Sequence, residues 1–184
     1  MKIRSFQGLR PSATAVQDVV AIPYDVVNTE EARRIAAGNP RSLLHVTRPE
    51  IDFPDGTDPY SNAVYAHAVG RFRALVEEGH LVRETGPCVY VYQQQMGDHC
   101  QSGIVALSHV EDYEQDRIKK HEKTRVAKEN DRTRLTADLN ANAGPVFLTY
   151  REVPALTRLM EEAAEQEPLY RLTTEDSITL TVWR

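Results

Sequence analysis

The spacing of apolar residues predicts four helices, of which the longest is the clearest. From Pro59 onward, alanine, valine, leucine and phenylalanine recur every three or four positions up to Gly79, which is the spacing of one face of an amphipathic helix. A shorter helix is expected after Asn28 or Thr29, either of which can act as an N-cap. The helices expected are residues 30–37, a segment from Pro59 to just before Gly79, residues 128–140 and residues 154–166.

Short runs rich in β-branched and aromatic residues predict strands between these helices. Two pairs of such runs lie close together in the sequence and are expected to form β-hairpins, one of them across a loop that contains Gly97. Locally paired strands that alternate with helices indicate an α+β (mixed α/β) class with a mixed, largely antiparallel sheet and flanking helices, in a single domain over residues 1–184. The strands expected are residues 16–22, 42–47, 145–150, the pair 88–94 and 102–112, and the pair 170–174 and 177–183.

Composition narrows the class of protein. The chain has 184 residues, 41% of them hydrophobic, which is enough to build a core, and its formal net charge of −5 disfavours a protein that coats nucleic acid. Apolar runs are too short to span a membrane, and no secretory signal follows Met1. The chain has only two cysteines, without a disulfide-dense spacing, so a cytoplasmic location is expected. A small anionic molecule or a nucleotide is the expected partner, on the strength of the basic segment and the family resemblance given below.

One basic segment stands out in this acidic chain. Residues 117–134 contain eight lysines and arginines against three acidic residues, so positive charge is concentrated there. Lys128 and Arg132 are four residues apart near the expected start of a helix, where free backbone N–H groups also favour an anion. A phosphate-binding site is therefore expected around them. The alternative is a solvated charged face in which Glu129 neutralises its basic neighbours.

The same segment contains a carboxylate among cations. Glu122 is flanked by Lys120, His121, Lys123 and Thr124, so it is expected to stay ionised and to serve as a base or as a Mg²⁺ ligand on a phosphate substrate. Alternatively, Thr124 caps the following turn and Glu122 balances the lysines. Neither the histidines nor the cysteines have the spacing of a metal site. The chain also has neither a P-loop nor a Rossmann glycine motif for binding the phosphates of a nucleotide.

Several motifs together resemble a known family. Pro-Tyr-Asp-Val at 23–26, His-Val-Thr-Arg-Pro-Glu at 45–50, His-Glu-Lys-Thr at 121–124 and Glu-Asn-Asp-Arg at 129–132 occur in the order found in the prokaryotic family catalogued as domain of unknown function 1015. The resemblance runs from about Phe6 to Trp183. Family members are typically about twice as long and carry a later Asp-Gly-His-His-Arg motif, which these 184 residues lack. The chain thus resembles the N-terminal part of a longer architecture.

The resemblance also implies a chemistry. The missing motif, with an upstream His-Glu, is similar to that of free-serine kinases of the ParB and sulfiredoxin-like superfamily. By this analogy the family transfers a phosphoryl group from ATP or ADP with Mg²⁺ to a small hydroxyl compound such as serine. Glu122 and His121 would then be catalytic, and this chain alone would be inactive. The residues expected to bind phosphate are Lys120, Lys123, Thr124, Lys128 and Arg132.

Further matches to the family pattern fall in expected loops and strand ends, where binding sites usually lie. The residues concerned could line a pocket, or could serve the fold alone, with Pro23 fixing a turn and Asp25 capping a helix. A non-catalytic binding or regulatory module for an anionic metabolite is the alternative function. The possible pocket residues are Tyr24, Asp25, Asn39, His45 and Arg48.

Overall fold

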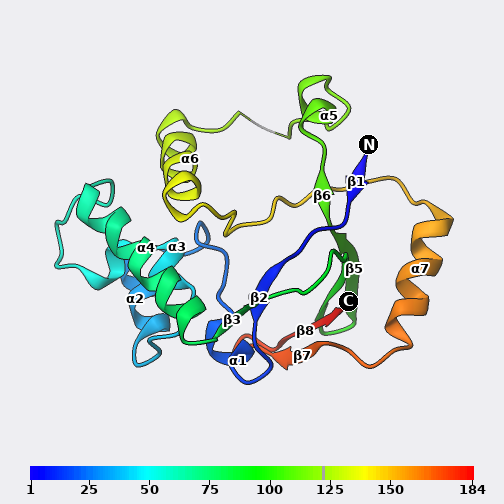
Figure 1. Cartoon of the computed structure of the whole chain (residues 1–184), viewed down its shortest axis with the longest axis horizontal. Helices are drawn as coiled ribbons and strands as arrows, with labels where there is room; N and C mark the ends of the chain where they lie inside the picture. Colours follow the sequence, from blue (N-terminus) through cyan, green and yellow to red (C-terminus); the bar gives the residue numbers. More distant parts are fainter. Residues whose placement is uncertain (122) are drawn as a thin grey trace. The chain divides into compact units, whose positions relative to one another are not determined.

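The computed structural model describes residues 1–121 and 123–184, and its helices and antiparallel sheets confirm the α+β class (Figure 1). The chain forms two compact units, each assembled from segments that are distant in the sequence. Unit 1 contains Met1–Ala13, Arg83–His121 and Leu148–Arg184. Unit 2 contains Thr14–Val82 and, among the described residues, 123–147. Strand β3 (Leu81–Arg83) lies where the chain passes from unit 2 to unit 1.

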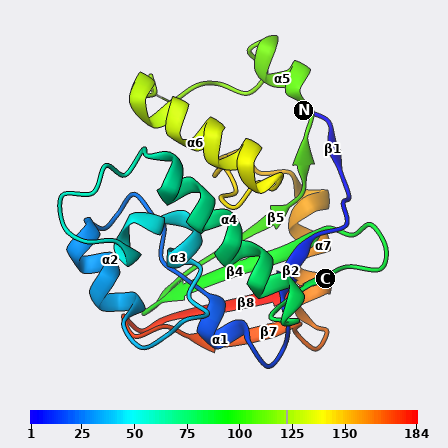
Figure 2. The ribbon, with the colours of Figure 1, turned by 60° about the vertical axis from the view of Figure 1, so that its left-hand side comes forward.

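Unit 1 is built on a four-stranded antiparallel sheet in the order β5-β4-β8-β7 (Figure 2). Both expected hairpins are present, and strand β4 lies between its sequence neighbour β5 and the distant strand β8. A separate short pair joins β1 to β6. The elements of this unit are β1 (Ile3–Arg4), β2 (Leu9–Pro11), β4 (Tyr90–Met96), β5 (His99–Val105), β6 (Leu107–Ser108), α5 (Val110–Glu114), α7 (Pro154–Ala164), β7 (Tyr170–Thr173) and β8 (Ile178–Trp183).

Helix α7 packs against β4 and β5. Most of the residues expected on its buried face are in fact buried in part. Leu156, Met160 and Ala163 are half-buried, whereas Leu159, which was also expected inside, is 47% exposed. The Trp183 indole N–H donates to the carbonyl of Gln166, 3.0 Å away, just beyond the end of α7. This bond ties the last strand to the helix.

A buried carboxylate anchors the N-terminal segment of unit 1. Glu84 accepts hydrogen bonds from the guanidinium groups of Arg10 and Arg184, and its side chain is only 4% exposed. The bond from Arg10, followed by that from Arg184, holds the pKa of Glu84 below its usual value against the opposing effect of burial. Arg10 also donates to the hydroxyl of Tyr170 on β7. One ion cluster therefore joins three segments of the chain.

Unit 2 is helical, and its core lies among small and aliphatic side chains. Ala32, Ala36, Leu44 and Ile51 are buried together, with Ala21 and Val27 packed against them. Helix α4 packs against both α3 and α6. The elements are α1 (Val16–Val19), α2 (Thr29–Ala36), α3 (Leu44–Thr47), the 3₁₀ helix η1 (Pro49–Asp52), α4 (Asn62–Glu77) and α6 (Val126–Leu139).

The expected helices of unit 2 begin and end close to where the sequence placed them. Asn28 caps α2, accepting from the Glu31 backbone N–H while the Glu31 carboxylate accepts from the Asn28 N–H, each at 2.9 Å. Helix α4 ends before Gly79, whose φ of +74° suits glycine. Helix α6 ends at Asn140 in the left-handed conformation.

Three expected strands are wrong. Residues 16–22 contain the helical turn α1, residues 42–47 contain α3, and residues 145–150 have no regular structure. A short apolar run has the same composition whether it is a buried strand or a buried helical turn, and only long-range contacts decide. Here the Leu43 N–H donates to the carbonyl of Val19, 3.2 Å away, so the two turns dock on one another.

The hairpin between β4 and β5 also differs in detail from the expectation. Its turn is the two residues Gly97 and Asp98, with Gly97 at φ +57°, rather than a longer loop. The expected strand 102–112 ends earlier, because Val110–Glu114 is helix α5. Asp112 is buried there and accepts from the backbone N–H of Lys2 at 2.6 Å and from Arg117 at 3.0 Å, which fixes the chain as a helical turn.

Candidate phosphate-binding site

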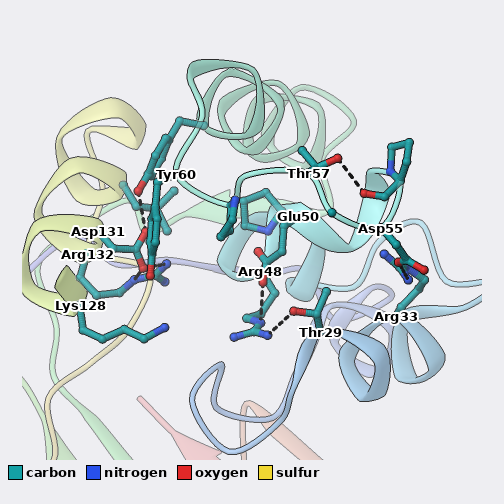
Figure 3. Close-up of a pocket in the computed structure, with 16 residues that line it drawn as sticks. Thr29, Arg33, Arg48, Glu50, Asp55, Thr57, Tyr60, Lys128, Asp131 and Arg132 are labelled. Carbon is teal, nitrogen blue, oxygen red and sulfur yellow. Dashed lines mark hydrogen bonds and ion pairs between the residues drawn. The ribbon is translucent and has the colours of Figure 1, made fainter. Parts of the chain in front are cut away.

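A cavity of about 430 Å³ in unit 2 gathers three of the charged side chains that the sequence singled out, Arg48, Lys128 and Arg132 (Figure 3). It is lined from α2, from the segment between Arg48 and Tyr60, from Tyr65 on α4, and from α6. Among the described residues the lining carries four cations and three carboxylates, which leaves a net charge of +1. These residues are Arg33, Arg48, Lys128, Arg132, Glu50, Asp55 and Asp131.

Lys128 and Arg132 lie one turn apart on α6, as the sequence predicted. Figure 3 shows both side chains extending from α6 toward Arg48. Lys128 is exposed, and its ammonium group has no ion pair or hydrogen bond within residues 1–121 and 123–184. It is therefore a cation of this cavity that a ligand can neutralise without displacing a described partner.

Arg132 is held in place on three sides. Its Nε and Nη2 donate to Oδ2 of Asp131 at 3.0 and 2.7 Å, and its Nη1 donates to the carbonyl of Thr47 at 3.2 Å. The guanidinium carbon lies 4.2 Å from the ring centroid of Tyr24, within cation–π range. Tyr24, an expected pocket residue, thus contacts the Arg132 guanidinium without itself lining the cavity. The arginine contributes charge to the cavity from a fixed position.

Asp131, near the middle of α6, connects this helix to α4. It is buried, and its Oδ1 accepts from the hydroxyl of Tyr65 at 2.7 Å. Burial, and next the hydrogen bond to Asp131, raise the pKa of Tyr65. The guanidinium carbon of Arg134 lies 4.0 Å from the Tyr65 ring centroid. These contacts fix the orientation of α6, from which Lys128 projects.

Arg48 and Glu50 form the central part of the lining, and their pairing is incomplete. Arg48 Nη2 donates to the hydroxyl of Thr29 at 3.0 Å. Its Nε lies 3.0 Å from Oε1 of Glu50, yet the pair lacks hydrogen-bond alignment, so the buried Nε has no hydrogen-bond partner among the described residues. The side chains are 13% and 15% exposed. The Arg48–Glu50 pair therefore keeps unused bonding capacity within the lining.

Arg33 shapes the far rim of the cavity. Its Nε and Nη2 donate to the carbonyls of Ile51 and Phe53 at 2.9 and 3.1 Å, and Nη1 pairs with Asp55 at 2.8 Å. Ile51 belongs to η1, and Phe53 and Asp55 belong to the loop that follows it. Arg33 therefore holds that loop against α2.

A histidine cluster fixes η1 from the side away from the lining. His45 Nδ1 lies 2.8 Å from Oδ1 of Asp52, and His67 Nε2 lies 2.6 Å from Oδ2 of the same carboxylate. His45 Nε2 also lies 3.0 Å from the carbonyl of Asn39. None of the four residues lines the cavity. His45 and Asn39 therefore contribute by holding the chain on which Arg48 and Glu50 lie.

The structure brings together three of the expected site residues and separates others. Lys128, Arg132 and Arg48 line one cavity. The remaining expected residues do not line it: Lys120 lies with its ammonium nitrogen 4.6 Å from the ring centroid of Tyr113 in unit 1, His121 is exposed in unit 1, and Asp25, Lys123 and Thr124 are exposed. Glu122 lies outside the described residues.

Several lining residues, Glu50 among them, were not expected from the sequence. Glu50 directly follows Arg48-Pro49 in a motif that the family resemblance had already singled out. Arg33 and Asp55 belong to no recognisable sequence motif, because their ion pair joins α2 to a loop that comes later in the sequence. The two charged residues on either side of Pro49 were the one local signal that could have indicated Glu50 as a site residue.

Within the described part of the chain, no group of three or more histidine, cysteine, aspartate or glutamate residues is arranged to hold a metal ion. No helix there is both long enough and apolar enough to cross a membrane. Carboxylates of the lining are the groups suited to a Mg²⁺ ion carried by a nucleotide, because protein-bound Mg²⁺ commonly uses one or two carboxylates together with substrate phosphates.

Comparison with known proteins identifies a family. The model of the family described as "Protein of unknown function (DUF1015)" matches residues 3–184. No curated protein and no solved structure matches the chain.

Proposed function

The chain belongs to the DUF1015 family, and for it we propose that the cavity of unit 2 binds the phosphate group of a small anionic molecule, within a nucleotide-dependent phosphotransferase. The observation that carries the proposal is the convergence of Lys128, Arg132 and Arg48 on one cavity. Two of these cations have fixed positions, and Lys128 lacks a described partner. Such an arrangement suits an oxyanion that arrives from solution.

Phosphoryl transfer places simple demands on a protein. The reaction needs the donor and the acceptor in line and the charge of the transferred group neutralised, so preorganised cations supply much of the catalysis. In the proposed reaction the acceptor hydroxyl oxygen bonds to the terminal phosphorus of ATP or ADP. The bond from that phosphorus to the bridging oxygen breaks, and the shortened nucleotide leaves with the bond's electron pair. The hydroxyl proton passes to a carboxylate.

Glu122 is the proposed acceptor of that proton, from the sequence motif alone. The family resemblance assigns part of the site to an Asp-Gly-His-His-Arg motif that these 184 residues lack. We therefore expect phosphate binding by this chain, and turnover only by a chain that also carries that motif.

A binding module without turnover is the second candidate. It is favoured by the position of His121, which the sequence analysis assigned to catalysis and which does not line the cavity. Turnover separates the two candidates. Incubation of the longer form with ATP, Mg²⁺ and serine yields phosphoserine and ADP if it is a kinase, and leaves both substrates intact if the cavity only binds.

Phosphate binding is tested first, with Lys128→Ala. Removal of a positioned cation is expected to weaken the binding of inorganic phosphate about tenfold, since a charge-assisted hydrogen bond contributes at least about 1.5 kcal/mol. Thermal melting across a phosphate titration measures the affinity, because stabilisation follows ligand binding. Lys119→Ala is the charge-matched control, since Lys119 lies in unit 1 in an exposed pair with Asp116. Equal phosphate affinity in the two variants would contradict the proposal.

A further inference from the structure

A carboxylate lies in the middle of the proposed phosphate site. Glu50 is drawn in Figure 3 between Lys128 and Arg132 on one side and Asp55 on the other, directly beside Arg48. A negative charge at this place opposes the binding of bare phosphate, because like charges repel strongly where water is partly excluded. A site built for inorganic phosphate alone would be expected to present cations and N–H donors there.

The other two carboxylates of the lining are already engaged. Asp131 is buried and accepts from Tyr65 and Arg132, which use both of its oxygens. Asp55 pairs with Arg33, and its side chain is 91% exposed at the rim. Neither has the position and the free capacity to receive a ligand inside the cavity.

Glu50 differs from both. Its side chain is 15% exposed, and its contact with Arg48 involves Oε1 without hydrogen-bond alignment. Oε2 accepts no hydrogen bond within the described part of the chain. A half-desolvated carboxylate with an unused oxygen is a strong acceptor for a hydroxyl or an ammonium group.

Resting on the function proposed above, we propose that Glu50 determines specificity by accepting a hydrogen bond from a hydroxyl or ammonium group of the ligand. The cavity then takes a phosphomonoester that carries such a donor next to its phosphate. Lys128 and Arg48 face the phosphate, and Glu50 faces the donor. The net charge of +1 on the lining matches one phosphate group better than a chain of three.

Two phosphomonoesters test this assignment by isothermal titration calorimetry. Glycerol 3-phosphate carries two hydroxyls, whereas ethyl phosphate has the same phosphate and no donor. The wild-type chain is expected to bind glycerol 3-phosphate at least about tenfold more tightly, because a hydrogen bond to a charged acceptor contributes at least about 1.5 kcal/mol.

Two substitutions at Glu50 separate specificity from a structural role. Glu50→Gln keeps a neutral acceptor and is expected to retain part of the preference. Glu50→Met keeps the length without an acceptor and is expected to abolish it. Ethyl phosphate is expected to bind both variants more tightly than wild type, since the repulsion is gone. Glu77→Gln, at the exposed end of α4 and outside the lining, is the control that leaves both affinities unchanged.

The outcomes are distinct. Equal wild-type affinity for the two esters, or an equal loss of both in the Glu50 variants, would overturn the role of Glu50 while leaving the phosphate site intact. Ester binding that is insensitive to Lys128→Ala would instead refute the proposed function itself.

Discussion

Replacement of Asp131 by asparagine tests whether a buried charge holds α6 against α4. The substitution keeps the side-chain shape but removes the charge. It also replaces one of the two acceptor oxygens, which receive Tyr65 and Arg132 respectively, with an NH₂ donor. Three hydrogen bonds at 2.7 to 3.0 Å converge on this carboxylate, and the side chain is 8% exposed. The substitution therefore disrupts hydrogen bonds that are largely shielded from solvent.

The magnitude follows from which partner is left unpaired. Breaking a buried ion pair by removing one charge typically costs about 3–5 kcal/mol. Arg132 is 28% exposed and keeps its bond to Thr47 and its contact with Tyr24, so it is partly compensated. We therefore expect a loss of about 3 kcal/mol in the free energy of unfolding, which lowers the melting temperature of a chain of this size by about 6–12 °C.

Urea unfolding followed by far-ultraviolet circular dichroism provides the measurement, since α2, α4 and α6 of unit 2 contribute much of the helix signal. Fluorescence of Trp183, the single tryptophan, reports on unit 1 in the same samples. Asp138→Asn is the control on the same helix, because its pair with Arg134 is exposed and is expected to contribute about 0.5 kcal/mol. A loss in Asp131→Asn no larger than in this control would refute the reasoning.

Two further predictions concern stability. The folded pKa of Glu84 is held below the ordinary glutamate value of about 4.5, so this group stabilises the fold fully above that pH, and its contribution is lost as the pH falls through the folded pKa. Glu84→Gln should therefore flatten the acid limb of a profile of urea midpoint against pH, and an unchanged acid limb would contradict this. Removal of the capping box with Asn28→Ala should lower the free energy of unfolding by about 1 kcal/mol in circular dichroism melts, whereas Asn28→Ser should retain most of it, and equal stability of the two variants would argue against the cap.

Local signals in the sequence were sufficient where neighbours in the chain determine the structure. The cap at Asn28 needs only Glu31, three residues later, and the β4–β5 hairpin, although not its exact turn, could be predicted from Gly97 and the flanking strands. The segment around Val19 was misassigned because its conformation depends on a contact with Leu43, which is distant in the sequence. Propensity gave way there to tertiary contact.

The candidate site divides in the same way. Lys128 and Arg132 were found because four residues along a helix place two cations on one face. Their meeting with Arg48 could be expected only from the family motif, since α6 and η1 are far apart in the sequence. The engagement of Arg132 by Asp131 and Tyr24 was not predictable, because spacing indicates neighbours but not which of them exchange hydrogen bonds.

The interleaving of the two units constrains the order in which the chain can be built. Synthesis from the N-terminus delivers β4 and β5 long before β8, the strand that occupies the other edge of β4. Unit 2 likewise waits for α6, which arrives only after the first hairpin of unit 1 has emerged. During translation β4 therefore has one unpaired edge, and α4 lacks the helix that covers Tyr65. Pairing on both edges of β4 is accordingly expected only once β8 has been synthesised, and until then the open edge of β4 exposes the nascent chain to aggregation.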